Sequence, residues 1–158
     1  MQPLHAVQGE SLLRRRALAI IIPLLVAAAL ESPANADDAG FVVIVSLDVP
    51  GAGIPRDVLS SIFLSESPRW GDGRPVDPVD QSLRSAVRAT FTERVHRKPV
   101  EGIESLWHRK IMGGVRPPKV KPSDAEVIAY VSEKKGAIGY VAASAPLPDT
   151  VKAVTIVD

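Results

Sequence analysis

Residues 41–47 (FVVIVSL) constrain the fold more than any other segment of the chain. The run is rich in β-branched residues, carries no charge and is too short for a helix. Such a run is typical of a strand that is buried on both faces of a sheet. A sheet with two buried faces needs helices to cover both of them. The segment therefore favours an α/β domain.

Four later segments space their apolar residues as helices do. One begins at Pro55, a residue favoured at the first position of a helix, and another begins at a capping box formed by Ser123 and Glu126. Gly139 is interpreted as a strand glycine that permits close packing. The order predicts a sheet covered by helices, with ligands beyond the carboxyl ends of its strands. The predicted helices cover residues 55–64, 82–96, 99–111 and 124–131, and the predicted strands cover residues 41–47, 75–79, 137–141 and 151–157.

The first 36 residues have the features of a cleavable secretory signal peptide. Residues 14–16 are arginines, residues 17–30 form an uncharged apolar run, and Ala34 and Ala36 occupy the two positions that a signal peptidase reads. A membrane anchor is the alternative, but the run has 14 residues, whereas a bilayer span needs about 20. We therefore expect residues 1–36 to be removed and residues 37–158 to act in the periplasm, with no membrane span after cleavage.

The composition of residues 37–158 excludes several classes of function. Removing residues 14–16 from the 19 basic residues leaves 16, and removing Glu10 and Glu31 from the 18 acidic residues also leaves 16. A net charge of zero gives no support to binding of nucleic acid or of anionic membranes. The absence of cysteine excludes disulfides, thiol catalysis and thiolate metal sites. The remaining length suits one domain that is stabilised by its core alone.

Three stretches carry motifs that occur together in one family. The first consists of residues 123–131 (SDAEVIAYV) followed by residues 136–141 (GAIGYV). The second consists of residues 62–64 (IFL) followed by Trp70, Asp72, Gly73 and residues 78–81 (PVDQ). The third consists of residues 85–91, which fit S-x-x-R-x-x-F. Together they resemble the phosphate-type periplasmic solute-binding proteins of ABC transporters, specifically their short single-domain relatives. The resemblance implies a type 2 periplasmic-binding-protein-like α/β sheet covered by helices and reduced in size. It also implies a non-enzymatic exported protein that works with an ABC-transporter permease or another envelope protein.

The candidate ligand site lies at the start of the helix predicted over residues 82–96. Ser82, Ser85 and Arg88 supply hydroxyls and a guanidinium, to which the helix adds its first-turn amides. In the family the matching turn reads approximately S-D-G-S-G-T, so Ser85 matches the central serine, whereas Leu83 replaces the acidic residue that accepts the ligand's proton. The resemblance therefore implies weak binding of phosphate or another oxyanion. The alternative is that both serines only cap the helix and that both arginines, Arg84 and Arg88, are solvated. If Arg88 instead binds the ligand, its replacement should still cost little stability, because an arginine at a helix start contributes little.

The other conspicuous residues show no catalytic or metal-binding pattern. Trp70 and Trp107 are interpreted as packing residues, and His96 and His108 lack acidic partners at metal-ligand spacing. No hydrolase, metalloprotease, phosphate-loop or dinucleotide motif occurs, so we expect no enzyme, no metal and no cofactor. The chain is also shorter than a protein that closes two lobes over its ligand. A partner-binding envelope protein with the same fold and no small-molecule ligand is therefore the alternative function.

Overall fold

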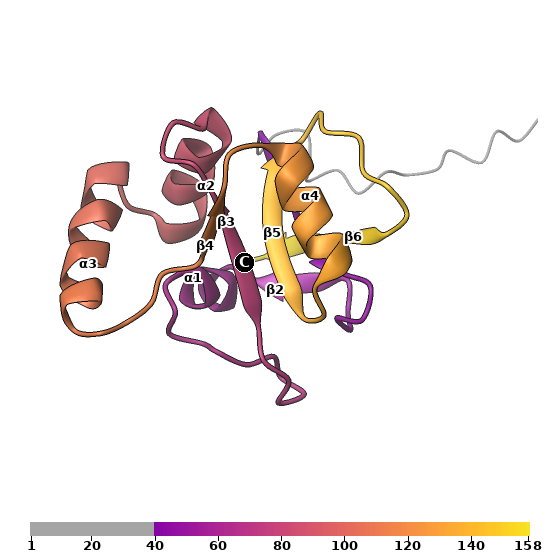
Figure 1. The fold of residues 1–158 in the computed structure, drawn as a ribbon, viewed down its shortest axis with the longest axis horizontal. Coiled ribbons are helices and arrows are strands. Elements are labelled where there is room, and N and C mark those ends of the chain that lie inside the picture. Colours follow the sequence, from indigo (N-terminus) through magenta and orange to yellow (C-terminus); the bar gives the residue numbers. More distant parts are fainter. Residues whose placement is uncertain (1–39) are drawn as a thin grey trace, which may run out of the picture. The chain divides into compact units, whose positions relative to one another are not determined.

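Six strands form one sheet in the computed structural model, which describes residues 40–158 (Figure 1). Their order across the sheet is β2-β6-β1-β5-β3-β4. The predicted signal peptide, residues 1–36, lies outside the described residues and stays a prediction. The strands are β1 (Phe41–Ser46), β2 (Gly53–Pro55), β3 (Asp77–Gln81), β4 (Lys119–Lys121), β5 (Ala137–Ala142) and β6 (Val151–Val157).

Five of these strands run in the same direction, and β1 runs against them. β1 pairs antiparallel with both β5 and β6, while the pairs β2–β6, β3–β5 and β3–β4 are parallel. Val43 in the middle of β1 therefore has Tyr140 on one side and Val154 on the other. As a consequence, the carboxyl ends of the five parallel strands meet at one edge of the sheet.

Helices cover both faces of the sheet, as the apolar run of β1 predicts. Val43 and Val45 of β1 point into a core that contains Phe63 of α1 and Phe91 of α2, whereas Ile44 points into a second core with residues of α4. In Figure 1, α4 lies across β5. The helices are α1 (Arg56–Phe63), α2 (Ala86–His96), α3 (Val100–Met112) and α4 (Asp124–Glu133). The predicted α/β class with a helix-covered sheet is confirmed.

One helix contributes little to these cores. α3 packs beside α2 at the side of the sheet (Figure 1), and Ile103 is its one buried residue. Trp107 is half-buried there, so its packing role stays a prediction. Trp70, in contrast, packs against the core of α1 and α2 and donates its Nε1 hydrogen to the carbonyl oxygen of Gly136 at 3.0 Å. Its interpretation as a packing residue is confirmed.

The boundaries of several elements differ from the sequence prediction. The strand expected over residues 75–79 begins at Asp77 and continues to Gln81, because Asp77 and Pro78 pair with β5 and the next three residues pair with β4. The helix expected from Ser82 begins only at Ala86. Pro55 precedes α1 as its N-cap and is the last residue of β2, rather than the first residue of the helix.

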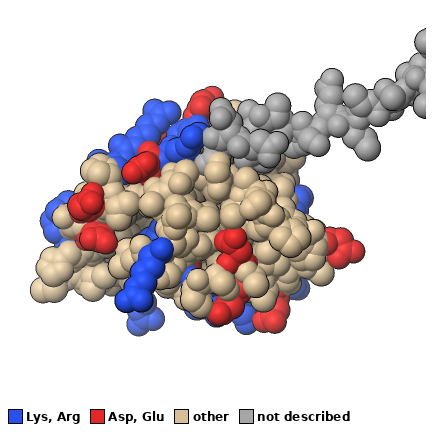
Figure 2. All heavy atoms as spheres, turned by 90° about the horizontal axis from the view of Figure 1, so that it is seen from above, with Lys and Arg blue, Asp and Glu red and all other residues tan. Residues whose placement is uncertain are grey.

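Charges of both signs are scattered over the face that Figure 2 shows. Lys and Arg side chains lie among Asp and Glu side chains there, and uncharged surface separates them. Such a mixture creates no extended field that would attract a polyanion. Within residues 40–158, no helix is both long and apolar enough to cross a membrane.

Candidate ligand site

Two capped helix N-termini lie at the carboxyl ends of neighbouring parallel strands. β3 ends at Gln81 and leads to α2, whose N-cap is Ser85; β4 ends at Lys121 and leads to α4, whose N-cap is Ser123. The first amides of a helix have no partner within the helix and carry a partial positive charge. This edge is therefore the part of the sheet where an anion would be expected.

Ser85 caps α2 and is hydrogen-bonded on both sides. Its Oγ accepts the amide hydrogen of Arg88 at 3.3 Å and donates its own hydrogen to Oε1 of Gln81 at 2.6 Å. The first bond satisfies one of the unpaired amides of the first turn, which is the usual role of an N-cap serine. The second bond holds the hydroxyl against the end of β3.

Ser82 belongs to the turn between β3 and α2, and not to the helix. Its amide donates to the carbonyl oxygen of Lys121 at 3.0 Å, and its own carbonyl oxygen accepts from the amide of Ser85 at 2.9 Å. The Oγ of Ser82 accepts from the amide of Arg84 at 3.3 Å. A serine hydroxyl that accepts one bond still has a hydrogen to donate, so Ser82 could donate to a ligand at this edge.

Arg88 is mostly enclosed and paired rather than solvated, which corrects the sequence-based alternative at this residue. Its Nη2 lies 3.1 Å from Oδ2 of Asp80, and its Nη1 donates to the carbonyl oxygen of Gln81 at 2.7 Å. The side chains of Arg88 and Asp80 are only 12% and 14% exposed. The guanidinium therefore points to the end of β3, and an incoming anion would compete with Asp80 for it.

Asp80 lies between two partners in this buried position. Its Oδ1 accepts the hydroxyl hydrogen of Tyr140, whose ring stacks on Phe91 at a centroid distance of 3.8 Å. Burial raises the pKa of Asp80, although the Arg88 guanidinium and the Tyr140 hydroxyl both act against that rise. Burial also raises the pKa of Tyr140. Because Arg88 and Asp80 balance each other, the pair adds no net charge to attract an anion.

Gln81 connects the N-termini of both helices to the sheet. Its Nε2 donates to Oδ1 of Asp124 at 2.6 Å and to the carbonyl oxygen of Tyr140 at 3.0 Å. Oδ2 of Asp124 accepts the amide hydrogen of Ala142 at 3.2 Å. Together with the bond from Ser85, these contacts join β3, β5, α2 and α4 through one buried amide side chain.

Sequence reasoning identified Ser82, Ser85 and Arg88, and the structure brings all three to the end of β3. It missed Asp80, Gln81, Asp124 and Tyr140 as members of the same hydrogen-bond network. The available signal was that each of these four residues lies inside a motif that resembles the family. Motifs that are far apart in the chain meet here in space.

The remaining candidates for chemistry show no metal arrangement. Within residues 40–158, no three His, Asp or Glu side chains are grouped so that they could hold a metal ion. His96 instead forms a hydrogen bond between its Nδ1 and the hydroxyl of Ser60 at 2.8 Å. Burial lowers the pKa of His96 to about 4, with a smaller contribution from the Arg88 charge.

Solved structures of phosphate-transport proteins share this fold. An ABC-type phosphate transport receptor from Vibrio cholerae matches 73% of this chain and 45% of its own, with 18% identity and a TM-score of 0.58. A Clostridium perfringens protein described as a phosphate ABC transporter substrate-binding protein, solved with bound phosphate, matches 74% of this chain and 44% of its own, with 20% identity and a TM-score of 0.60. PstS from Borrelia burgdorferi matches 74% of this chain and 47% of its own, with 16% identity and a TM-score of 0.59.

The fold of the chain is thus the fold of phosphate-type substrate-binding proteins, and the resemblance noted in the sequence is confirmed at that level. The chain spans less than half the length of the solved structures that it matches. No protein-family model matches the sequence, and the sequence matches no curated protein.

Proposed function

We propose that the chain is an exported, non-enzymatic binding protein of the phosphate ABC transporter type that binds phosphate or another oxyanion weakly at the N-terminus of α2. The observation that carries the proposal is the meeting of Ser82, Ser85 and Arg88 with a helix N-terminus at the carboxyl end of β3. The shared fold supports it, because one of the similar structures holds phosphate. A periplasmic location and an ABC-transporter permease as partner are parts of the same proposal.

The contacts of the site explain why binding would be weak. An oxyanion at this edge would accept from the first-turn amides of α2 and from the hydroxyl of Ser82. Arg88 would add a charge-assisted hydrogen bond only by loosening its contact with Asp80, 3.1 Å away. The binding free energy that Arg88 contributes is therefore the difference between its hydrogen bond to the ligand and the contact with Asp80 that it gives up.

Calorimetric titration with phosphate tests the site. Arg88→Ala should weaken binding by up to about ten-fold, the lower end of what one charge-assisted hydrogen bond contributes, because Arg88 loosens its bond to Asp80 when it binds the ligand. Asp80→Asn should tighten binding, because the guanidinium is then released from its carboxylate. Arg84→Ala is the matched control: it removes the same charge from the same turn, but Arg84 is exposed. Equal binding by wild type and Arg88→Ala would place the site elsewhere.

The alternative is a partner-binding envelope protein that uses the same fold without a small ligand. The internal bonds of Ser85 and Arg88 favour it, because both side chains already have protein partners. It predicts that millimolar phosphate or sulfate leaves the melting temperature unchanged, including in Asp80→Asn. A specific protein captured from an envelope extract, together with that lack of any thermal shift, would decide for this alternative.

A further inference from the structure

A cavity lies at the carboxyl ends of β2 and β6, the parallel pair at the other side of the sheet. It has a volume of about 610 Å³, which is within the usual range of small-molecule sites. Its lining includes Arg56 at the start of α1, Arg97 after α2, and Asp158 after β6. None of the residues that line it belongs to the candidate site around Ser85.

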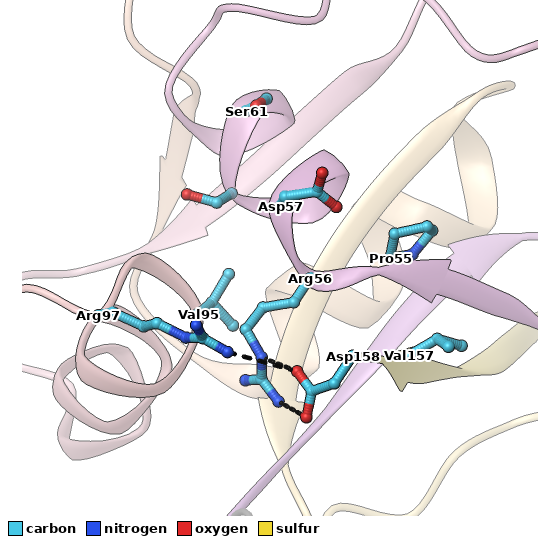
Figure 3. A pocket seen from close by; sticks show the side chains of 9 residues that line it. Pro55, Arg56, Asp57, Ser61, Val95, Arg97, Val157 and Asp158 are labelled. Atoms are coloured by element: carbon cyan, nitrogen blue, oxygen red, sulfur yellow. Dashed lines mark hydrogen bonds and ion pairs between the residues drawn. The ribbon is translucent and has the colours of Figure 1, made fainter.

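We propose that this cavity binds a small carboxylate through Arg56, in the place that the Asp158 side chain now occupies. The guanidinium of Arg56 donates to both carboxylate oxygens of Asp158, from Nε to Oδ1 and from Nη2 to Oδ2 at 2.9 Å. Such a fork of two parallel hydrogen bonds matches the two oxygens of a planar carboxylate, and phosphate is the other common group that it matches. Figure 3 shows the guanidinium groups of Arg56 and Arg97 directed at the same carboxylate.

The arginine of this pair is hydrogen-bonded to a second element of the protein, whereas the aspartate side chain is mostly exposed. Nη1 of Arg56 donates to the carbonyl oxygen of Arg94 near the end of α2 at 2.7 Å, which fixes the plane of the guanidinium. The Arg56 side chain is 23% exposed, but that of Asp158 is 66% exposed. An exposed ion pair contributes little net stability, so an external carboxylate can displace Asp158 without breaking the fold.

The charges around the cavity also favour an anion once Asp158 has moved. Arg56 and Arg97 are then opposed by one lining carboxylate, Asp57. An oxygen of Asp57 accepts the amide hydrogen of Val58 at 2.9 Å, within its own helix. Hydrogen bonding to Arg56 holds the pKa of the Asp158 carboxyl below its usual value, so the position stabilises the ionised form of a carboxylic acid.

The residues that line the cavity indicate the chemistry of the part of the ligand beyond its carboxylate. Pro55 and Val157 contribute apolar surface, and Ser60 and Ser61 line the side of α1. The hydroxyl of Ser60 is already bonded to His96. A short aliphatic carboxylate therefore fits the lining, with its charged end at Arg56 and its chain against Pro55 and Val157.

A titration with pentanoate, followed by NMR of the arginine side-chain Nε–H groups, tests the proposal on the purified protein. The Arg56 resonance should shift with pentanoate and not with chloride at equal ionic strength. Asp158→Asn should tighten binding by about two- to five-fold, because the internal competitor is removed. Arg56→Lys keeps the charge but loses the fork, and it should weaken binding at least about ten-fold. Arg109→Gln, which changes an exposed arginine of α3, is the control and should bind as wild type does.

Three results would overturn the proposal. The first is that the Arg56 resonance of Asp158→Asn does not shift with millimolar pentanoate. The second is that wild type and Arg56→Lys bind pentanoate equally well. The third is that phosphate binds at Arg56 as tightly as pentanoate does. If Arg56→Lys does not fold, the Asp158→Asn titration alone decides. The result is independent of the proposed function, because Arg88→Ala should leave pentanoate binding unchanged and Arg56→Lys should leave phosphate binding unchanged.

Discussion

At Gly139 in β5, the packing of the sheet leaves no room for a side chain. A Cβ added there would lie 2.7 Å from Cγ1 of Val127 and 2.9 Å from Cγ1 of Val79, which are closer than real Cβ contacts. The close-packing role predicted from the sequence is confirmed. Gly139→Val should therefore lower the free energy of unfolding by about 1–3 kcal/mol, as overpacking usually does. Urea unfolding measures this, with Gly71→Val as the control because a Cβ at Gly71 meets nothing within 4 Å.

Arg88 should matter for stability as well as for binding. Arg88→Ala leaves Asp80 in a position where its side chain is only 14% exposed and its charge has lost its partner. We expect a loss of about 2–3 kcal/mol, somewhat below the range for fully buried pairs. The double variant with Asp80→Asn should recover much of that loss. A single variant as stable as wild type would contradict the buried pair.

His96 should make stability depend on pH. Its pKa is about 4 in the folded protein against an ordinary value of 6.5, so between these values only the unfolded chain takes up the proton. The stabilisation is complete above pH 6.5, falls as the pH is lowered, and changes no further below about pH 4. The loss is at most on the order of 3 kcal/mol. The comparison of wild type with His96→Gln isolates it, because the opposite effect of the raised pKa of Asp80 is common to both.

At the scale of elements, the bonds of Gln81 should hold two helix N-termini at once. Gln81→Met keeps the approximate shape but leaves Ser85 and Asp124 without their bonds to the side-chain amide. Because Ser85 and Asp124 are half-buried, the groups left unpaired should together cost about 1–3 kcal/mol. Hydrogen exchange should become faster in the first turns of both α2 and α4. Thr90→Ala, which removes an exposed hydroxyl within α2, should leave α4 unchanged.

The elements that the sequence predicted are those with a strong local pattern. β1 is a continuous apolar run, and α4 begins at a capping serine whose Oγ accepts the amide hydrogen of Glu126. β2 and β4 have three residues each and exist because of distant partners, since Ile54 pairs with Ile156 and Val120 pairs with Asp80. No period of 2 or 3.6 can be recognised in three residues.

The same distinction explains what could be predicted of the candidate site. The cap at Ser85 is a local feature, and the sequence alone indicates it as a candidate cap. The burial of Arg88 depends on Asp80 and on the hydroxyl of Tyr140, which comes 60 residues later than Asp80 in the chain. Whether an arginine is paired or solvated is decided by such tertiary contacts, so a helix position alone could not reveal it.

At the scale of the whole molecule, export should leave a defined N-terminus. If residues 1–36 are a signal peptide, the mature chain begins at Asp37, three residues before the described part of the structure. Mass spectrometry of periplasmic material should show that N-terminus, since the small residues before it fit the specificity of a signal peptidase. Intact chain beginning at Met1 in the membrane fraction would contradict the prediction.

The central position of β1 has a consequence for how the chain reaches its folded state. β1 is synthesised before the other strands, yet its two neighbours, β5 and β6, are synthesised after all the others. Val43 can pair only after Tyr140 and then Val154 have been synthesised, so the middle of the sheet depends on contacts between distant parts of the chain. Pairing of this kind forms slowly. The middle of the sheet therefore cannot close until β6 has left the ribosome, and if residues 1–36 are a signal peptide this delay would leave time for export to begin before folding is complete.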